Sequence, residues 1–457
     1  MDGQEGSVKQ RAEVWVAIPA TDRPASLELL CKQLVERAAR AAVPLRILVA
    51  ENSRREVHRA DNQRMLANLQ VAVELENTTG GESIALSRRR LQKMIASALS
   101  RHDRPRLVWM LDDDVRLTHV FWDGSHVVDR PLHNHIELLL DMHQRHPNLD
   151  VLVGEVTGDP PIPAFATLAT RLTDLAYNLR LLLDRSEDDP WCVPAESLRI
   201  VSDRDAYYDL SLDRSPAWLQ PVAWLPRVRG ARTADVWREL AATVSCIPFG
   251  VASTRPVLAR LDHFDVMDHH ALRGGNAVFF DVDACLEHEY PSMDIAGVAT
   301  RRGDMVGTRL LQRKRPGRVM TSAFSVAHAR PTEGSWPTRA EMHRSVLGDT
   351  FGALLAREVD AVIRGVCPGD FVLQRIERLR LSAHRLRAAC CEVGELLDRT
   401  PCAFGWSPDG VRPLLDWVVQ EVPTGGGVLP RDLEAKLGDP EVHARVAEHA
   451  RALVGRN

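Results

Sequence analysis

The chain has 457 residues and a formal net charge of −4, with 45% hydrophobic and 26% charged residues. This composition excludes a disordered chain, a collagen-like fibre and a small disulfide scaffold. The near-balanced charge excludes a bulk nucleic-acid binder and leaves room only for a local basic patch. At roughly 100–200 residues per domain, the length predicts two to four domains.

Targeting and redox signals are absent from the sequence. No cysteine pair has the C-x-x-C spacing, so zinc-finger and thioredoxin-like motifs are unsupported. Residues 1–11 are polar and lack the apolar segment of a signal peptide. No apolar run reaches the roughly 18 residues that a membrane span needs. We therefore expect a reduced, cytoplasmic protein without a transmembrane segment.

The first third of the chain alternates predicted strands and helices. Short apolar runs predict strands at residues 14–18, 45–50, 71–75, 107–111 and 150–153. Apolar residues at helical spacing predict helices at residues 26–42, 87–99 and 135–146. This order predicts an α/β fold with an open, mostly parallel sheet and helices on both faces. Ligands of such sheets bind at the carboxyl ends of the strands.

The rest of the chain divides into three predicted parts. An insertion at about residues 184–245 is followed by further strands at 277–280 and 319–326. From Pro337 onward the pattern is helical, with an apolar stripe over residues 370–397. We expect an α/β domain at 1–335 and a helical domain at 336–457. The stripe needs burial, against the first domain or in a homodimer contact.

The strongest chemical signal is the run of three acidic residues Asp112, Asp113 and Asp114 after an apolar strand. Adjacent carboxylates repel one another, so such a run is stable where it is exposed or bound to a cation. A hard divalent cation with oxygen ligands suits it. In an extended chain Asp112 and Asp114 point to the same side, and the outer pair is therefore the predicted site. A polar turn after a strand is the simpler alternative.

Other catalytic motifs are missing. The sequence contains no G-x-x-x-x-G-K-[ST], no G-x-G-x-x-G after a strand, no H-E-x-x-H and no G-x-S-x-G. This weakens P-loop nucleotide hydrolysis, dinucleotide binding, zinc proteolysis and α/β-hydrolase chemistry.

Several short segments between about residues 12 and 330 occur in a characteristic order. They are Pro19-Ala20-Thr21-Asp22-Arg23-Pro24, Glu51-Asn52-Ser53, Gly80-Gly81 with Ser87-Arg88-Arg89, Asp112-Asp113-Asp114, Gly274-Gly275-Asn276, Arg301-Arg302-Gly303-Asp304 and His328. In this order they resemble the GT-A class of glycosyltransferases, which use nucleotide-sugar donors. The acidic run resembles the Asp-x-Asp motif of that class. The C-terminal helical region has no counterpart in the resemblance.

The resemblance implies a role for each segment. Asp114 would hold Mn²⁺ or Mg²⁺, with Asp112 and His328 as further ligands. Asp304 would be the general base of an inverting transfer. The implied donor-binding residues are Pro19, Thr21, Arg23, Glu51, Asn52, Arg88, Asp112, Asp113, Gly275 and Asn276. The enzyme would be a hexosyltransferase-like glycosyltransferase with a nucleotide-diphosphate sugar donor.

Structural alternatives stay open for several of these residues. Asp304 could be the N-cap of a helix, and His328 an ordinary strand-end histidine. Arg88 to Arg90 could form a solvated helix face, as could the histidines at 133, 135, 143 and 146. The basic run at residues 309–318 is typical of a surface patch; a functional patch there would attract an anionic acceptor.

Two other functions compete with glycosyl transfer. A nucleotidyltransferase would make a nucleotide-sugar, but that reaction usually comes with a glycine-rich loop, and residues 19–24 contain no glycine. A non-catalytic nucleotide-binding module is the second alternative, and the intact acidic run argues against it.

Overall fold

The structure is a computed structural model. It describes residues 13–456 apart from 104, 106, 124–126, 160–164, 202–217, 222, 225–229, 253–254, 260–265, 268–276, 331, 333–334, 368, 401, 403 and 423–428.

A central sheet of nine strands organises the part of the chain that the structure describes. Its strands are β1 (Val14–Ala20), β2 (Leu45–Glu51), β3 (Ala72–Asn77), β4 (Leu107–Met110), β5 (Val115–Arg116), β8 (Val151–Gly158), β11 (Val266–Met267), β12 (Val278–Phe280) and β15 (Val319–His328). Their spatial order is β11-β15-β8-β12-β4-β1-β2-β3, and β5 pairs with β15.

The strand directions place six carboxyl ends at one edge of the sheet. β1, β2, β3 and β4 are mutually parallel, and β15 runs parallel to β8. Because β12 is antiparallel to both β4 and β8, the two parallel groups point the same way. β5 and β11 pair antiparallel with β15. The expected α/β fold class, an open and mostly parallel sheet flanked by helices with a C-terminal helical region, is confirmed.

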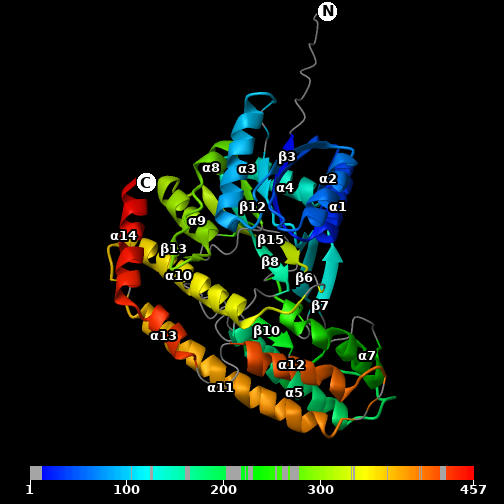
Figure 1. The fold of residues 1–457 in the computed structure, drawn as a ribbon. Helices are drawn as coiled ribbons and strands as arrows, with labels where there is room; N and C mark the ends of the chain where they lie inside the picture. Colours follow the sequence, from blue (N-terminus) through cyan, green and yellow to red (C-terminus); the bar gives the residue numbers. More distant parts are fainter. Residues whose placement is uncertain are drawn as a thin grey trace, which may run out of the picture.

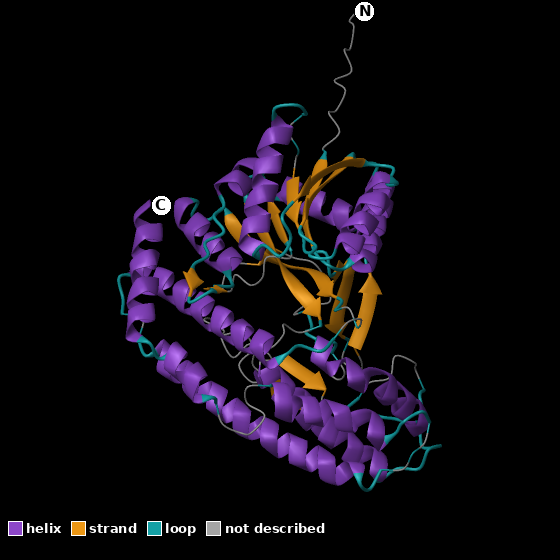
Figure 2. Cartoon of the chain, viewed as in Figure 1, coloured by secondary structure: helices purple, strands orange, loops and turns teal. Residues whose placement is uncertain are grey.

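Helices cover both faces of the sheet (Figures 1 and 2). The alternation along β1 shows why: Val14, Val16 and Ile18 enter one hydrophobic cluster, whereas Trp15 and Ala17 enter the other. The first cluster includes α1 (Pro24–Ala41), α2 (Glu56–Ala67) and α4 (His135–Arg145). The second includes α3 (Ile84–Leu99), α8 (Val282–Glu287) and one residue of α9 (Gly303–Lys314).

A separate helical layer has its own hydrophobic core. It contains α5 (Phe165–Leu183), α7 (Thr233–Thr243), α10 (Arg339–Arg364), α11 (Phe371–Leu397), α12 (Pro408–Glu421), α13 (Arg431–Leu437) and α14 (Pro440–Arg456). Figure 1 shows α11 running alongside α5. The apolar stripe of α11 is therefore buried within the chain, where Leu379 and Leu386 are fully covered, and it gives no support for a homodimer contact. The C-terminal helices share this core with α5 and α7.

Shorter elements complete the described chain. Three two-stranded sheets pair β6 (Thr118–Trp122) with β7 (Val127–Pro131), β9 (Leu198–Val201) with β10 (Trp218–Pro221), and β13 (Asp294–Ile295) with β14 (Val298–Ala299). Two 3₁₀ helices span Ala195–Ser197 and Val244–Phe249. Among the described residues, no helix combines the length and the apolar character that crossing a membrane requires.

His135 on α4 departs from the expected solvated face. Its side chain is fully buried, because α4 packs under β15. The ring nitrogens lie 2.6 Å from the Leu132 carbonyl oxygen and 3.3 Å from that of Ser325, and the ring meets Phe324 edge-on. Burial lowers the pKa of His135 to about 4, although the two carbonyls oppose this shift. The sequence pattern was misleading here because the polar imidazole finds its partners inside the fold.

The buried ring makes stability depend on pH. In the unfolded chain this histidine has a pKa near 6.5 and takes up a proton as the pH falls below that value. In the folded chain the His135 ring stays neutral until the pH approaches about 4. The contribution of the neutral His135 ring to the free energy of unfolding is complete above pH 6.5 and is lost as the pH falls toward 4. We predict that His135 accounts for about 2 kcal/mol of lost stability between about pH 7 and about pH 5. Urea denaturation should show this loss in the native protein and a smaller loss in His135→Gln. The exposed His133→Gln variant is the matched control, and equal pH dependence in all three proteins would contradict the assignment.

Candidate functional site

The acidic run follows β4 at the carboxyl edge of the sheet, where the chain turns at Asp113 and Asp114. After the turn, β5 folds back onto the end of β15, so that Val115 pairs with His328. The Asp114 carbonyl also accepts a hydrogen bond of 2.8 Å from the Ala329 N–H. This pairing brings two segments 216 residues apart in sequence onto one site, as the Arg330–Asp114 contact shows.

Asp112, Asp114 and His328 converge at this point. One ligand atom from each lies within 4.8 Å of the other two. The outer carboxylates belong to this group, although the chain turns at Asp113, where the sequence argument assumed an extended strand. Two carboxylates and an imidazole fit a divalent cation of the Mn²⁺ type. Burial and the charge of Arg330 lower the pKa of His328, so its ring is the neutral form that binds metals.

Arginines balance the charge of the acidic run. Asp114 Oδ2 lies 2.9 Å from Arg23 Nη1 and 2.8 Å from Arg330 Nη1. Asp112 Oδ1 lies 2.9 Å from Arg88 Nη2. Burial would raise the pKa of Asp114, but the charges of Arg330 and Arg23 outweigh it and lower this pKa to about 2. The run is thus a charge-compensated cluster; Asp113 and Asp114 do form a turn after the strand, but both are buried.

Asp113 is not one of the three converging residues and holds the loop after β1. Its carboxylate accepts hydrogen bonds from the Thr21 N–H at 2.7 Å, the Thr21 hydroxyl at 2.9 Å and Arg23 Nη1 at 3.0 Å. Burial raises the pKa of Asp113 to about 6, although Arg23 and Thr21 work against this. Asp113, Thr21 and Arg23 therefore act together to fix the loop beside the acidic cluster. Pro19 lies within buried β1.

Glu51 at the end of β2 is fully buried and points inward. One carboxylate oxygen accepts from the Ser53 N–H at 2.7 Å, and the other from Asn62 Nδ2 at 2.6 Å. Asn62 lies on α2, a helix that the sequence patterns did not predict. These two hydrogen bonds hold the first residues of the loop after β2 against α2.

Asn52 ties that loop to the following one. Its Oδ1 accepts from the Thr78 hydroxyl at 2.9 Å and the Glu82 N–H at 2.8 Å, and its Nδ2 donates to the Glu82 carbonyl at 2.9 Å. Gly80 between them has a φ of +85°, and a Cβ there would lie 2.8 Å from the Ser53 carbonyl oxygen. Only glycine accommodates this turn and this close approach. Sequence reasoning missed Thr78 and Glu82, whose partners are far away in the chain.

Arg88 pairs with Asp112 of the acidic cluster and also experiences the charge of Asp304. The Arg88 side chain is buried rather than solvated, and its guanidinium carbon lies 5.6 Å from the centre of the Tyr290 ring. Burial would lower the pKa of Arg88, but the negative charges of Asp112 and Asp304 raise it. Asp304 thus lies near the acidic run, in the first turn of α9. The N-cap of α9 is Arg302, so the capping interpretation of Asp304 is wrong.

Helix α10 clamps the segment that leads to Asp304. Arg302 has a φ of 64°, a left-handed conformation that is unfavourable for a side chain with a Cβ. Asp349 on α10 holds its guanidinium by two hydrogen bonds of 3.1 Å. The Arg301 N–H also donates to the Gly348 carbonyl at 3.0 Å, and a Cβ on Gly352 would lie 2.1 Å from the Arg301 carbonyl oxygen. The C-terminal helical region therefore contributes directly to this part of the site.

Two predicted segments remain, residues 274–276 and the basic run at residues 309–318. Gly275 and Asn276, together with Gly274, are outside the described residues. In the basic run, Arg315 pairs with Asp150 at 2.6 Å and Glu287 at 2.7 Å, and Arg318 pairs with Asp150 at 2.6 Å. These partners reduce the capacity of that run to attract an anionic acceptor.

The chain was compared with known proteins. No family model matches it, and no curated protein matches it. Solved structures are similar to it: S. aureus TarS 1-349 in complex with UDP-GlcNAc has 9% identity, a TM-score of 0.35 and coverage of 96% of this chain and 92% of that chain. The mannosyltransferase PcManGT from Pyrobaculum calidifontis, in complex with GDP-Man and Mn²⁺, has 12% identity, a TM-score of 0.34 and coverage of 96% and 88%. Because these TM-scores lie below 0.5, the similarity carries no conclusion about the function of this chain.

The contact between Arg302 and Asp349 can be tested by a double-mutant cycle. We predict that Asp349→Asn lowers the free energy of unfolding by about 1–2 kcal/mol, because Arg302 loses its ion pair while keeping its unfavourable backbone conformation. In the Arg302→Gly background, where glycine adopts that conformation freely, the same substitution should cost less than about 0.5 kcal/mol. Asp360→Asn on the same helix is the control, since Asp360 pairs with Arg364 and should cost the same in both backgrounds. Additive effects of Arg302→Gly and Asp349→Asn would contradict the clamp.

Proposed function

We propose that the chain is a metal-dependent glycosyltransferase that moves a hexose from a nucleotide-diphosphate donor to an acceptor hydroxyl, with inversion at the anomeric carbon. The observation that carries this proposal is the convergence of Asp112, Asp114 and His328 at the carboxyl edge of the sheet, with Asp304 nearby. Open α/β sheets bind their ligands at this edge.

Asp112, Asp114 and His328 would hold a divalent cation, Mn²⁺ or Mg²⁺. As a Lewis acid, the cation supplies stabilisation for the negative charge that grows on the leaving diphosphate. Mn²⁺ is favoured, because His328 adds a nitrogen ligand to the two carboxylates.

The arginines around the cluster have a second role in this proposal. Arg23 and Arg330 both reach Asp114 Oδ2 in the structure. With a cation held by Asp114, their guanidinium groups would be placed to donate to the oxygens of the donor diphosphate, with which arginine forms strong charge-assisted hydrogen bonds. Arg88 stays buried against Tyr290 and orients Asp112. The Asp113-anchored loop, with Thr21 and Arg23, lines the donor side.

Asp304 acts on the acceptor. The acceptor hydroxyl oxygen attacks the anomeric carbon and forms the new glycosidic bond, while the bond from that carbon to the diphosphate oxygen breaks. The leaving diphosphate keeps the bonding electron pair, and the hydroxyl proton passes to the Asp304 carboxylate. Residues 1–335 supply the metal and donor groups, and the region 336–457 holds the Arg302–Asp304 segment in place through α10.

The metal site is tested by removing one carboxylate charge. Asp114→Asn keeps the shape of the side chain and leaves Arg23 and Arg330 with a hydrogen-bond acceptor, whereas Asp114→Ala would remove an ion-pair partner from both arginines. We predict that Asp114→Asn lowers Mn²⁺-dependent binding of UDP or GDP by at least about 100-fold, since the cation loses a charged ligand. Calorimetry with Mn²⁺ and each nucleotide measures this.

The same measurement includes two comparisons. His328→Ala should weaken binding less than Asp114→Asn, because water can replace the imidazole. Asp129→Asn, on the exposed strand β7, should leave binding unchanged. Unchanged Mn²⁺ affinity in Asp114→Asn would contradict the metal site.

The role of Asp304 is tested separately. We predict that Asp304→Asn lowers glycosyl transfer by roughly two to four orders of magnitude, while Mn²⁺-dependent nucleotide binding persists, because an amide cannot accept the proton. Transfer is followed with a panel of nucleotide-sugars and Mn²⁺, first as slow donor hydrolysis to the nucleoside diphosphate. Pyrophosphate exchange would favour a nucleotidyltransferase instead, and binding without turnover a non-catalytic module.

A further inference from the structure

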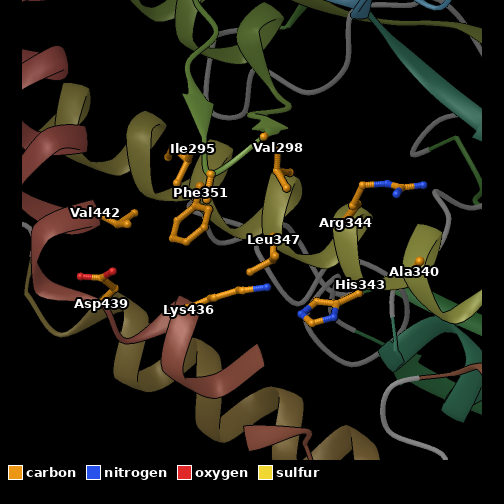
Figure 3. Close-up of a pocket in the computed structure, with 12 residues that line it drawn as sticks. Ile295, Val298, Ala340, His343, Arg344, Leu347, Phe351, Lys436, Asp439 and Val442 are labelled. Carbon is orange, nitrogen blue, oxygen red and sulfur yellow. The ribbon is translucent and has the colours of Figure 1, made fainter. Parts of the chain in front are cut away.

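A pocket of about 300 Å³ lies in the helical layer beside the β13–β14 hairpin (Figure 3). Its walls come from the hairpin, from α10, from the end of α13 and from the beginning of α14. The volume is at the lower end of the range of small-molecule sites, about 300–1,000 Å³. The pocket can therefore hold an extended chain or a ring system.

One side of the pocket is apolar. Figure 3 shows the Phe351 ring facing it, with Ile295 and Val298 of the hairpin above, Leu347 next to it on α10 and Val442 opposite. Phe351 and Leu347 are almost completely buried in the core of the helical layer. Apolar surface that is preformed and rigid in this way favours an apolar ligand group.

The other side is polar and carries an excess of positive charge. Arg344 and Lys436 are exposed there, whereas the carboxylate of Asp439 accepts the Glu441 N–H at 2.9 Å. His343 stands between α10 and α13; its Nδ1 lies 3.7 Å from the Asp432 carboxylate. His343 Nε2 is buried without a hydrogen-bond partner among the described residues. The two exposed cations suit an anionic head group.

The pocket is joined to the proposed active site by a short piece of chain. Val298 in its wall and Asp304 are six residues apart, a separation that even a fully extended chain limits to about 20 Å. The same helix α10 that lines the pocket with Leu347 also clamps Arg302 through Asp349. The wall of the pocket therefore lies no more than about 20 Å from Asp304, a separation that an elongated molecule can span.

We propose that this pocket binds the acceptor, and that the acceptor is an amphiphilic anion in which an apolar chain or ring carries a phosphate or a carboxylate in addition to the hydroxyl that receives the sugar. The apolar part lies against Phe351 and Leu347, and the anionic group pairs with Lys436 and Arg344. The inference rests on the proposed glycosyltransferase function, for which it supplies the substrate class.

The test is calorimetry on the full-length chain with n-octyl phosphate below its micelle concentration. One saturable site is expected, with inorganic phosphate and the neutral octyl glucoside binding at least about tenfold more weakly, because each offers only half of the recognised chemistry. Octanoate is the second anionic probe. Tighter binding of octyl phosphate assigns a phosphate to the natural acceptor, and tighter binding of octanoate assigns a carboxylate.

Two variants place the binding in this pocket. Lys436→Glu, which reverses one charge, and Val442→Trp, which fills the apolar side, should each weaken octyl phosphate binding at least about tenfold. Arg431→Glu is the matched control, since Arg431 is exposed on the same helix α13 and outside the pocket, and it should bind as the native chain does. Absent binding, or binding that both pocket variants retain, would overturn the proposal.

Mn²⁺-dependent UDP or GDP binding on the same samples separates the two levels of the argument. If the nucleotide binds and octyl phosphate does not, the acceptor inference fails while the proposed function stands. If octyl phosphate binds at the pocket and no nucleotide binds with Mn²⁺, the glycosyltransferase proposal fails.

Discussion

Charge compensation at the end of β4 is the constraint on which the site depends. Three consecutive carboxylates repel one another, and two of them are almost completely buried. Arg23 at the start of α1, Arg88 in α3 and Arg330 after β15 come from three distant parts of the chain to balance them. The cluster can therefore form only when the sheet is assembled, because each arginine is positioned by a different element. Removing one member leaves an uncompensated charge in a poorly solvated place.

The second constraint comes from the helical layer. α10 approaches the segment 299–302 at Gly348 and Gly352, where a Cβ would collide with backbone carbonyl oxygens. This close contact lets Asp349 reach Arg302 and holds the residue in a left-handed conformation. The position of Asp304 thus depends on a region that follows the sheet in sequence. The C-terminal helices are part of the same physical unit as the proposed active site.

The sequence predicted most of the sheet because its strands are short apolar runs that are buried on both faces. The outer acidic pair was predicted from the alternation of side chains along an extended chain, and His328 only from the family resemblance; the ligand atoms of all three lie close together in the structure. Glu51 and Asn52 were located correctly at a strand end, but their hydrogen bonds to Asn62, Thr78 and Glu82 were not predictable from local patterns. His135 shows the same limit: a polar residue on a helix is buried because its ring nitrogens find the Leu132 carbonyl and the Ser325 carbonyl of β15. The Arg302–Asp349 pair joins residues 47 positions apart and has no sequence signature.

The most direct test of this account is a crystal structure of the full-length chain with Mn²⁺ and a nucleoside diphosphate, with data collected at the manganese absorption edge. The account predicts one strong anomalous peak between the Asp112 and Asp114 carboxylates and the His328 ring, with Arg23 or Arg330 turned from Asp114 to the diphosphate. An anomalous peak elsewhere, or a bound diphosphate with no manganese at these three residues, would contradict it.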